Sequence, residues 1–170
     1  QLRTPNSSQI NLRLDKKQAF KSILKRDGLF SYSAWGKMYK RELFNFIRFP
    51  VGKIYEDALI LSKLLSIVNF IGRVENTCYY YRIRTGSIML SSFSENDLER
   101  ISIVDSFSEQ AVIHFPELVT YVKNYRINIR IEVARKLLYS DNYMAYQNEY
   151  IKLSKGIQSL SKGKEINTKN

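Results

Sequence analysis

The chain has 170 residues, 44% hydrophobic and 25% charged, which is typical of a folded globular protein and excludes a wholly disordered one. One cysteine, Cys78, excludes a disulfide within the chain, and one histidine, His114, excludes a zinc site built from several Cys and His ligands. The net charge is +11, from 27 Lys and Arg against 16 Asp and Glu, and it favours an anionic partner such as nucleic acid, anionic lipid or a phosphorylated small molecule.

The charge is unevenly distributed along the chain. Residues 1–93 hold 16 basic and 6 acidic residues, residues 94–115 are acidic overall, and residues 116–170 hold 10 basic and 5 acidic residues. No apolar run reaches the roughly 18–20 residues that cross a membrane, and the first residues lack the apolar core of a signal peptide. We therefore expect a protein of a reducing compartment.

Two helices are predicted in the first fifty residues. We expect an irregular lead-in over residues 1–14 and then a helix that has Asp15 as its N-cap and stops at Gly28. A dense aromatic stretch follows. A short helix is expected near Arg41–Phe46, and it must end before Pro50 because the residue preceding a proline disfavours helical backbone angles.

A loop over Phe49–Tyr55 leads to an apolar helix over residues 58–69, which Glu56 and Asp57 open. Acidic side chains are favoured in a first turn because the N–H groups there are unpaired and the helix dipole is positive. On this evidence alone, the two carboxylates are ordinary helix-start residues.

The pattern changes to strands after Gly72. Val74 and residues 77–83 are rich in β-branched and aromatic side chains, and an exposed loop follows them. Almost no strand signal precedes residue 74, so an alternating series of strands and helices is incomplete. Neither GxGxxG nor GxxxxGK[ST] occurs, which excludes those two phosphate-binding loops.

Three helices are expected towards the C-terminal end. Ser94 and Asp97 have the spacing of a capping box, Pro116 starts a second helix, and a third covers residues 143–160. The second helix places apolar residues at spacings of three or four, namely Leu118, Val122, Tyr125, Ile129, Val133 and Leu137. The sequence thus predicts a helix-rich α+β fold with a small β element around residues 70–84 and a C-terminal helical bundle.

Three stretches between residues 30 and 90 occur in a recognisable order: SAWGKMYKRELF, IRFPVGKIYEDA and YYYRIRTGSIM. They resemble the second half of family 2 glycosyltransferases of the GT-A fold, most closely the bacterial enzymes that build capsular, exopolysaccharide or cell-wall glycans. Those enzymes read W-x-K-x-Y, R-F-P-x-G-x-x-Y-E-D and Y-Y-Y-R-x-R-x-x-S at similar spacings. The resemblance implies that residues 1–93 are the C-terminal part of a GT-A catalytic domain and residues 94–170 a C-terminal helical region.

The resemblance also implies an inverting transfer of a sugar from a nucleotide-diphosphate donor to an acceptor hydroxyl. Asp57 matches the catalytic base of the family, and Glu56 is the neighbouring carboxylate that binds the acceptor or orients the site. A base positioned in this way contributes roughly 10²–10⁴ in rate. The dipole at the helix start is expected to hold Asp57 ionised.

Five further residues are predicted to bind substrate. Arg84 and Ser87 match a loop that closes over the nucleotide-sugar in the family, where arginines stabilise the diphosphate leaving group, and Arg82 is the more structural of the two arginines. Lys37 is expected to contact donor phosphate or acceptor, and Trp35 to form an aromatic wall for a sugar ring. The alternative for the arginines is a solvent-facing hairpin end, and for Trp35 a place in the core.

The resemblance implies a Mg²⁺ or Mn²⁺ ion that an Asp-x-Asp motif in the nucleotide-binding half holds against the diphosphate. This chain contains no Asp-x-Asp motif, and the strands that carry it in the family are missing. We therefore expect a fragment that binds no metal and transfers no sugar by itself.

The expected partners of the full-length protein are a nucleotide-sugar donor and a glycan or lipid-linked acceptor, in the cytoplasm or on the inner face of the membrane. The alternative is a basic helical module that binds nucleic acid or an anionic membrane, although no nucleic-acid-binding motif is present. On the membrane reading, five cations of the C-terminal helices would lie against anionic lipid: Lys123, Arg126, Arg130, Arg135 and Lys136. The alternatives are that these helices cover the catalytic half or pair two copies of the chain.

Overall fold

The computed structural model describes residues 12–74, 82 and 92–163. The chain divides into two compact units, residues 1–85 and residues 86–170, which we call the N-terminal unit and the C-terminal unit. The described part is rich in helix and contains one two-stranded sheet, so the predicted helix-rich α+β class is confirmed. The predicted division at residue 93 concerns function and stays a prediction.

The sheet pairs strand β1 (Leu12–Asp15) antiparallel with strand β2 (Phe70–Arg73) in the N-terminal unit. Leu14 is buried, and the guanidinium of Arg13 lies 3.7 Å from the centre of the Phe70 ring. One expectation is therefore wrong, because β1 lies within the supposed irregular lead-in. Strand β2 lies within the β element predicted around residues 70–84. The strand expected over residues 77–83 lies largely outside the described residues.

Helix α1 (Lys16–Lys25) begins at Asp15, as predicted. The Asp15 carboxylate accepts from the Gln18 N–H at 2.7 Å, and the Gln18 side chain accepts from the Asp15 N–H at 2.8 Å. This reciprocal pair is a capping box, which satisfies N–H groups that a helix start leaves unpaired. The helix ends before Gly28, because Arg26 already adopts the left-handed conformation at φ 57°.

Replacement of Asp15 by Ala should lower the free energy of unfolding of the N-terminal unit by about 1 kcal/mol, the usual value of an N-cap side chain. Urea denaturation followed by the fluorescence of the single Trp35, which lies in this unit, measures the effect. Asp15→Asn is the matched control, because Asn caps a helix as well as Asp does and should leave the midpoint unchanged.

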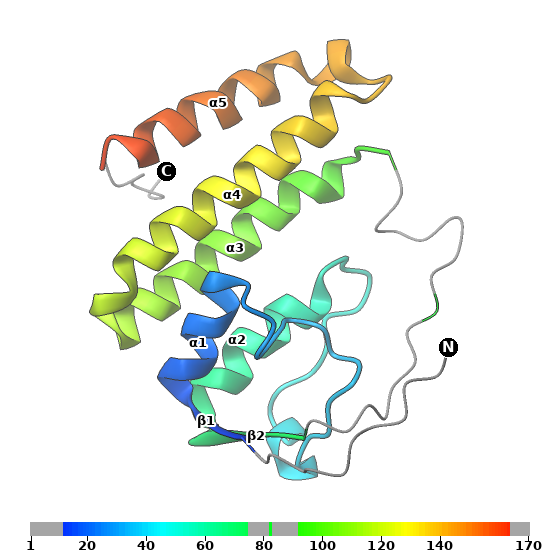
Figure 1. Cartoon of the computed structure of the whole chain (residues 1–170). Coiled ribbons are helices and arrows are strands. Elements are labelled where there is room, and N and C mark those ends of the chain that lie inside the picture. Colours follow the sequence, from blue (N-terminus) through cyan, green and yellow to red (C-terminus); the bar gives the residue numbers. More distant parts are fainter. Residues whose placement is uncertain (1–11, 75–81, 83–91, 164–170) are drawn as a thin grey trace, which may run out of the picture. The chain divides into compact units, whose positions relative to one another are not determined.

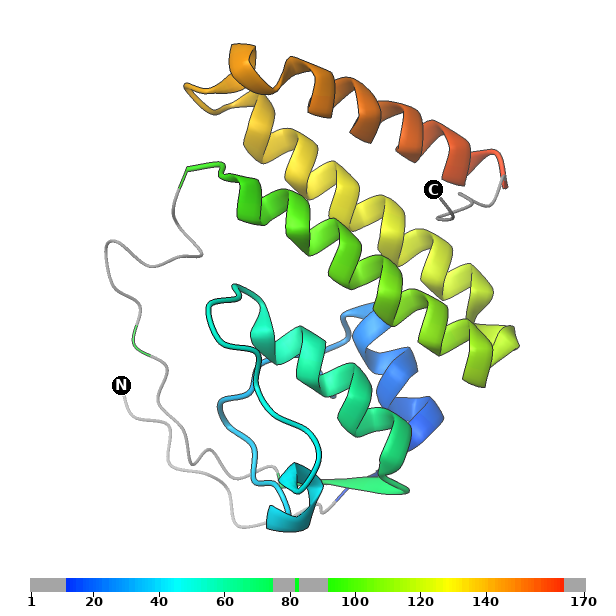
Figure 2. The ribbon, with the colours of Figure 1, turned by 180° about the vertical axis from the view of Figure 1, so that it is seen from behind.

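Helix α2 (Glu56–Ile67) packs on α1 in the N-terminal unit. Both helices bury an apolar face, with these buried residues: Ala19, Phe20, Ile23 and Leu24 on α1, and Ala58, Ile60, Leu61, Leu64 and Leu65 on α2. A short 3-10 helix η1 (Arg41–Phe44) stands where a helix near residues 41–46 was predicted. Figures 1 and 2 show the rest of residues 26–55 as loops beside α2.

The C-terminal unit consists of three long helices that lie side by side, α3 (Glu95–His114), α4 (Val119–Leu138) and α5 (Gln147–Ser161) (Figure 1). The 3-10 turns η3 (Pro116–Leu118) and η4 (Tyr143–Tyr146) join them. The capping box of Ser94 and Asp97 forms as predicted, and all six apolar positions predicted for the second helix are buried.

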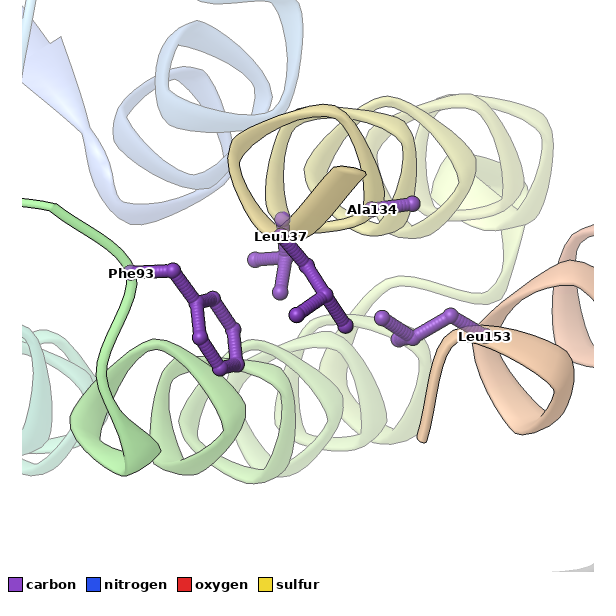
Figure 3. Close-up of a cluster of buried hydrophobic side chains, with 5 residues drawn as sticks. Phe93, Ala134, Leu137 and Leu153 are labelled. Atoms are coloured by element: carbon purple, nitrogen blue, oxygen red, sulfur yellow. The ribbon is translucent and has the colours of Figure 1, made fainter. Parts of the chain in front are cut away.

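One core cluster of this unit joins residues from three segments. In Figure 3 the side chains of Phe93, Leu137 and Leu153 point toward one another, from the segment that precedes α3, from α4 and from α5. Leu137 is fully buried between the other two. This cluster therefore holds the segment before α3, the end of α4 and the first half of α5 together.

Charged residues also join α3 to α4. Asp105 accepts from Arg126 at 2.8 Å and from Arg130 at 2.5 Å, and Asp97 accepts from Lys136 at 2.8 Å. Arg130 is buried and therefore does not face lipid, while Arg126 and Lys136 also bind carboxylates of the neighbouring helix. Whether the remaining cations of this unit meet an anionic membrane stays a prediction. In the part of the chain that the structure describes, no helix is long and apolar enough to cross a membrane.

Candidate active site

The two candidate carboxylates stand in the first turn of α2, directly after a strained residue. Tyr55 adopts the left-handed conformation at φ 64°, which costs an L-residue about 1–3 kcal/mol and is enriched at functional sites. Its carbonyl oxygen accepts from the N–H groups of Ala58 at 3.1 Å and Leu59 at 3.3 Å, so the helix begins sharply at Glu56. The turn at Tyr55 determines where the Asp57 side chain lies.

Asp57 is half-buried and bound by backbone donors. Its Oδ1 accepts from the Ala58 N–H at 2.8 Å, and the N–H of Ala34, in the loop before η1, also donates to its carboxylate. Burial raises the pKa of Asp57 above its ordinary value, and the charge of Glu56 raises it further, while the two N–H groups and Lys37 offset part of this rise. Burial is thus the largest influence on this carboxyl group, and the expectation that the helix dipole holds Asp57 ionised stays a prediction.

Lys37 lies across the same loop. Its Nζ donates to the carbonyl oxygen of Ser33, and it lies 3.4 Å from the Oγ atoms of both Ser31 and Ser33. The ring of Phe30 is 5.1 Å away. Burial lowers the pKa of the Lys37 ammonium, although the charge of Asp57 acts in the opposite direction.

A series of aromatic rings leads away from Asp57. The Tyr39 hydroxyl donates to the Ala34 carbonyl at 3.4 Å, and burial raises the pKa of Tyr39, with the charge of Asp57 adding to the rise. The Tyr39 ring packs edge-on against Phe44 at 5.6 Å, and Phe44 stacks on Phe49 at 6.0 Å. The Phe49 ring is 40% exposed, so the series ends at the surface.

The structure therefore brings together Asp57, Lys37 and Tyr39 around the backbone of Ser33 and Ala34. Sequence patterns indicated neither the Ala34 N–H nor the ring pair of Phe44 and Phe49. A backbone donor leaves no signature in a sequence, and the two phenylalanines look like ordinary core residues.

The remaining predicted site residues are placed only in part. Trp35 lies in the same loop as Lys37 with 48% of its surface exposed, Glu56 is partly buried, and the side chain of Arg82 is exposed. Arg84 and Ser87 lie outside the described residues. Their expected place in a substrate-binding loop stays a prediction.

The described residues do not offer a metal site. Within residues 12–74, 82 and 92–163, no three His, Cys, Asp or Glu side chains gather in a metal-binding arrangement. A Mg²⁺ or Mn²⁺ ion would need several oxygen ligands, and among the described residues Glu56 is the acidic group that acts on Asp57.

The raised pKa of Asp57 has a measurable consequence for stability. The folded chain holds the Asp57 proton more tightly than the unfolded chain does, so ionisation of this group costs folding free energy. The cost is absent at pH values below the pKa of Asp57 in the unfolded chain, and it is complete above the pKa of Asp57 in the folded chain. An active-site carboxylate commonly carries such a cost, whereas an N-cap carboxylate like Asp15 stabilises its helix.

Asp57→Asn should therefore unfold at a higher urea concentration than the wild type at neutral pH, because Asn carries no charge to bury. The difference between the two chains should disappear as the pH falls below the ordinary pKa of an aspartate. Trp35 fluorescence in urea at a series of pH values measures it. A variant that is less stable than the wild type at neutral pH would contradict the prediction.

Comparison with known proteins shows partial similarity to a transferase. Over 81 residues the chain is 35% identical to "Glycosyltransferase GlyA" of Streptococcus pneumoniae serotype 4, strain ATCC BAA-334 / TIGR4. The match covers 48% of this chain and 11% of that protein, so the chain spans about a tenth of the relative's length. About half of the chain is thus related to a glycosyltransferase.

No family model matches the chain. No solved structure matches it either.

Proposed function

We propose that the chain is the C-terminal part of the catalytic domain of an inverting, family 2 glycosyltransferase of the GT-A fold, acting in bacterial polysaccharide or glycan synthesis. The observation that carries the proposal is Asp57: a half-buried carboxylate at a strained helix start, bound by the Ala34 N–H and influenced by the charge of Lys37. The partial similarity to a named glycosyltransferase supports it.

In the proposed reaction the acceptor hydroxyl oxygen attacks the anomeric carbon of the donor sugar. Asp57 takes the hydroxyl proton while the new C–O bond forms. The bond from the anomeric carbon to the diphosphate breaks on the opposite face, and the nucleoside diphosphate leaves with the electron pair. The configuration at the anomeric carbon is thereby inverted.

The raised pKa of Asp57 suits this role. A general base works best when its pKa lies close to the working pH, provided that it remains ionised. Burial moves the pKa of Asp57 in this direction, and the Ala34 and Ala58 N–H groups limit the shift. Glu56, the neighbouring carboxylate, is proposed to bind or orient the acceptor.

The proposal assigns the other residues to substrate contacts. Trp35 supplies an apolar surface for a sugar ring, while Arg84 and Ser87, with Arg82 beside them, stabilise the diphosphate as it leaves. A Mg²⁺ or Mn²⁺ ion on the donor would be held by residues outside this chain. The acceptor is a glycan or a lipid-linked glycan, reached in the cytoplasm or at the inner face of the membrane.

The test is a transfer assay with the full-length protein and a panel of nucleoside-diphosphate sugars, with nuclear magnetic resonance of the product. We expect release of nucleoside diphosphate and a product whose anomeric configuration is opposite to that of the donor. A product with the donor's configuration would contradict the inverting mechanism. Isothermal calorimetry tests the fragment proposal: the 170-residue chain should show no micromolar binding of UDP-glucose in the presence of Mn²⁺.

A further inference from the structure

The ammonium group of Lys37 contacts protein oxygen atoms rather than standing free at the site. An ammonium has three N–H donors. Three oxygen atoms lie within hydrogen-bond distance of Nζ: the Ser33 carbonyl oxygen and the Oγ atoms of Ser31 and Ser33. The Lys37 side chain therefore links the two ends of the loop of residues 31–37.

The same loop supplies a donor to Asp57. Ala34 follows Ser33 directly, its N–H donates to the Asp57 carboxylate, and its carbonyl oxygen accepts from the Tyr39 hydroxyl at 3.4 Å. Because Lys37 binds the carbonyl oxygen of Ser33, it holds the very peptide group whose N–H belongs to Ala34. The position of this donor consequently depends on Lys37.

Lys37 also sets the charge around Asp57. Among the residues that the structure describes, the ionisable groups coupled to the carboxylate are Glu56, which is negative, Lys37, which is positive, and Tyr39, which is neutral below its raised pKa. Lys37 is the cation that offsets the mutual repulsion of the two neighbouring carboxylates. In a partly buried site such an interaction is screened less than at the surface.

We infer that Lys37 is a positioning residue for Asp57, which holds the Ala34 N–H in place and supplies the positive charge opposite the carboxylate. This inference deepens the proposed function, because it assigns to Lys37 a part in preparing the base instead of a contact with donor phosphate. Its structural content does not depend on the reaction.

The primary test is the titration of the Asp57 carboxyl carbon by nuclear magnetic resonance in the 170-residue chain. Lys37→Met should raise the titration midpoint of Asp57 by about 0.5 pH units or more, as loss of a nearby opposite charge does. Lys37→Arg keeps the positive charge, so its Asp57 midpoint should lie between those of the wild type and Lys37→Met. The planar guanidinium group does not reproduce the three contacts of the ammonium. An unchanged midpoint in Lys37→Met would overturn the inference.

Lys40→Met is the matched control. Lys40 lies three residues further along the same segment, and its exposed ammonium pairs with Glu42 at 3.9 Å. Its removal should leave the Asp57 midpoint unchanged. An equal shift in both variants would show a general effect of charge and would also overturn the inference.

A reciprocal titration, of the Lys37 amine in Asp57→Asn, tests the same interaction even if Lys37→Met does not fold. The interaction between two titrating groups is the same seen from either side. Asp57→Asn should therefore lower the titration midpoint of the Lys37 amine by about as much as Lys37→Met raises that of Asp57. A Lys37 amine that titrates identically in the wild type and in Asp57→Asn would contradict the inference.

The activity of the full-length protein separates positioning from substrate binding. Positioning predicts that Lys37→Met moves the acid limb of kcat/KM to higher pH with little change in the KM for the nucleotide-sugar. A contact with donor phosphate predicts a raised KM and an unmoved acid limb, and this result would overturn the inference. The titrations need no transfer reaction, so they stand even if the protein transfers no sugar.

Discussion

Replacement of Asp57 by Asn in the full-length protein is expected to lower the rate of sugar transfer by about 10²–10⁴, the contribution of a positioned general base. Asn is of similar size and can still accept from the N–H groups of Ala34 and Ala58, so the loop and the helix start should keep their places. What is lost is the ability to take the acceptor proton. The measurement is the initial rate of nucleoside diphosphate release at saturating donor.

Two variants control for this result. Glu42→Gln removes an exposed carboxylate of the same unit, paired only at the surface with Lys40, and should leave the rate unchanged. Glu56→Gln should have a smaller effect than Asp57→Asn, because Glu56 is proposed to orient the acceptor. Unchanged turnover in Asp57→Asn would rule out Asp57 as the base.

The second large effect concerns Asp105, which joins α3 to α4. Asp105→Ala should destabilise the C-terminal unit by about 3–5 kcal/mol, because it leaves the buried guanidinium of Arg130 without its carboxylate. Arg126 loses the same partner. The double variant Asp105→Ala with Arg130→Met should recover part of the loss, since the unpaired buried charge is then gone.

Circular dichroism at 222 nm in urea reports mainly on this unit, because it holds the three long helices, whereas Trp35 reports on the N-terminal unit. Asp105→Ala should shift the helical transition and leave the Trp35 transition in place. Glu149→Ala, which removes an exposed pair with Lys152 at 3.7 Å, should cost no more than about 1 kcal/mol. Equal effects in the two variants would contradict the structural role of Asp105.

The long helices could be predicted because each carries its own local signal. The N-cap at Asp15 and the capping box at Ser94 need only residues three apart, and both form as expected. The buried stripe of α4 follows from spacing alone. Strand β1 could not be predicted in the same way: four residues are too short for a periodic signal, and its partner β2 lies more than 50 residues further along the chain.

The candidate site was predictable in one respect. The position of Asp57 at a helix start and the surrounding motifs both indicated this residue, although the direction of its pKa shift depends on burial, which only the folded chain determines. The role of Lys37 could not be foreseen, because a lysine in a sequence does not reveal which oxygen atoms surround its ammonium. The same holds for the cations of α4, whose carboxylate partners Asp97 and Asp105 stand on another helix.

The central claim, that Asp57 is the base of a sugar transfer, is tested most directly by comparing two pH dependences. One is the acid limb of kcat/KM for transfer by the full-length protein, and the other is the titration of the Asp57 carboxyl carbon in the same protein. We predict that the two midpoints coincide above the ordinary pKa of an aspartate and move together to higher pH in Lys37→Met. A transfer rate that stays constant while Asp57 titrates would contradict the claim.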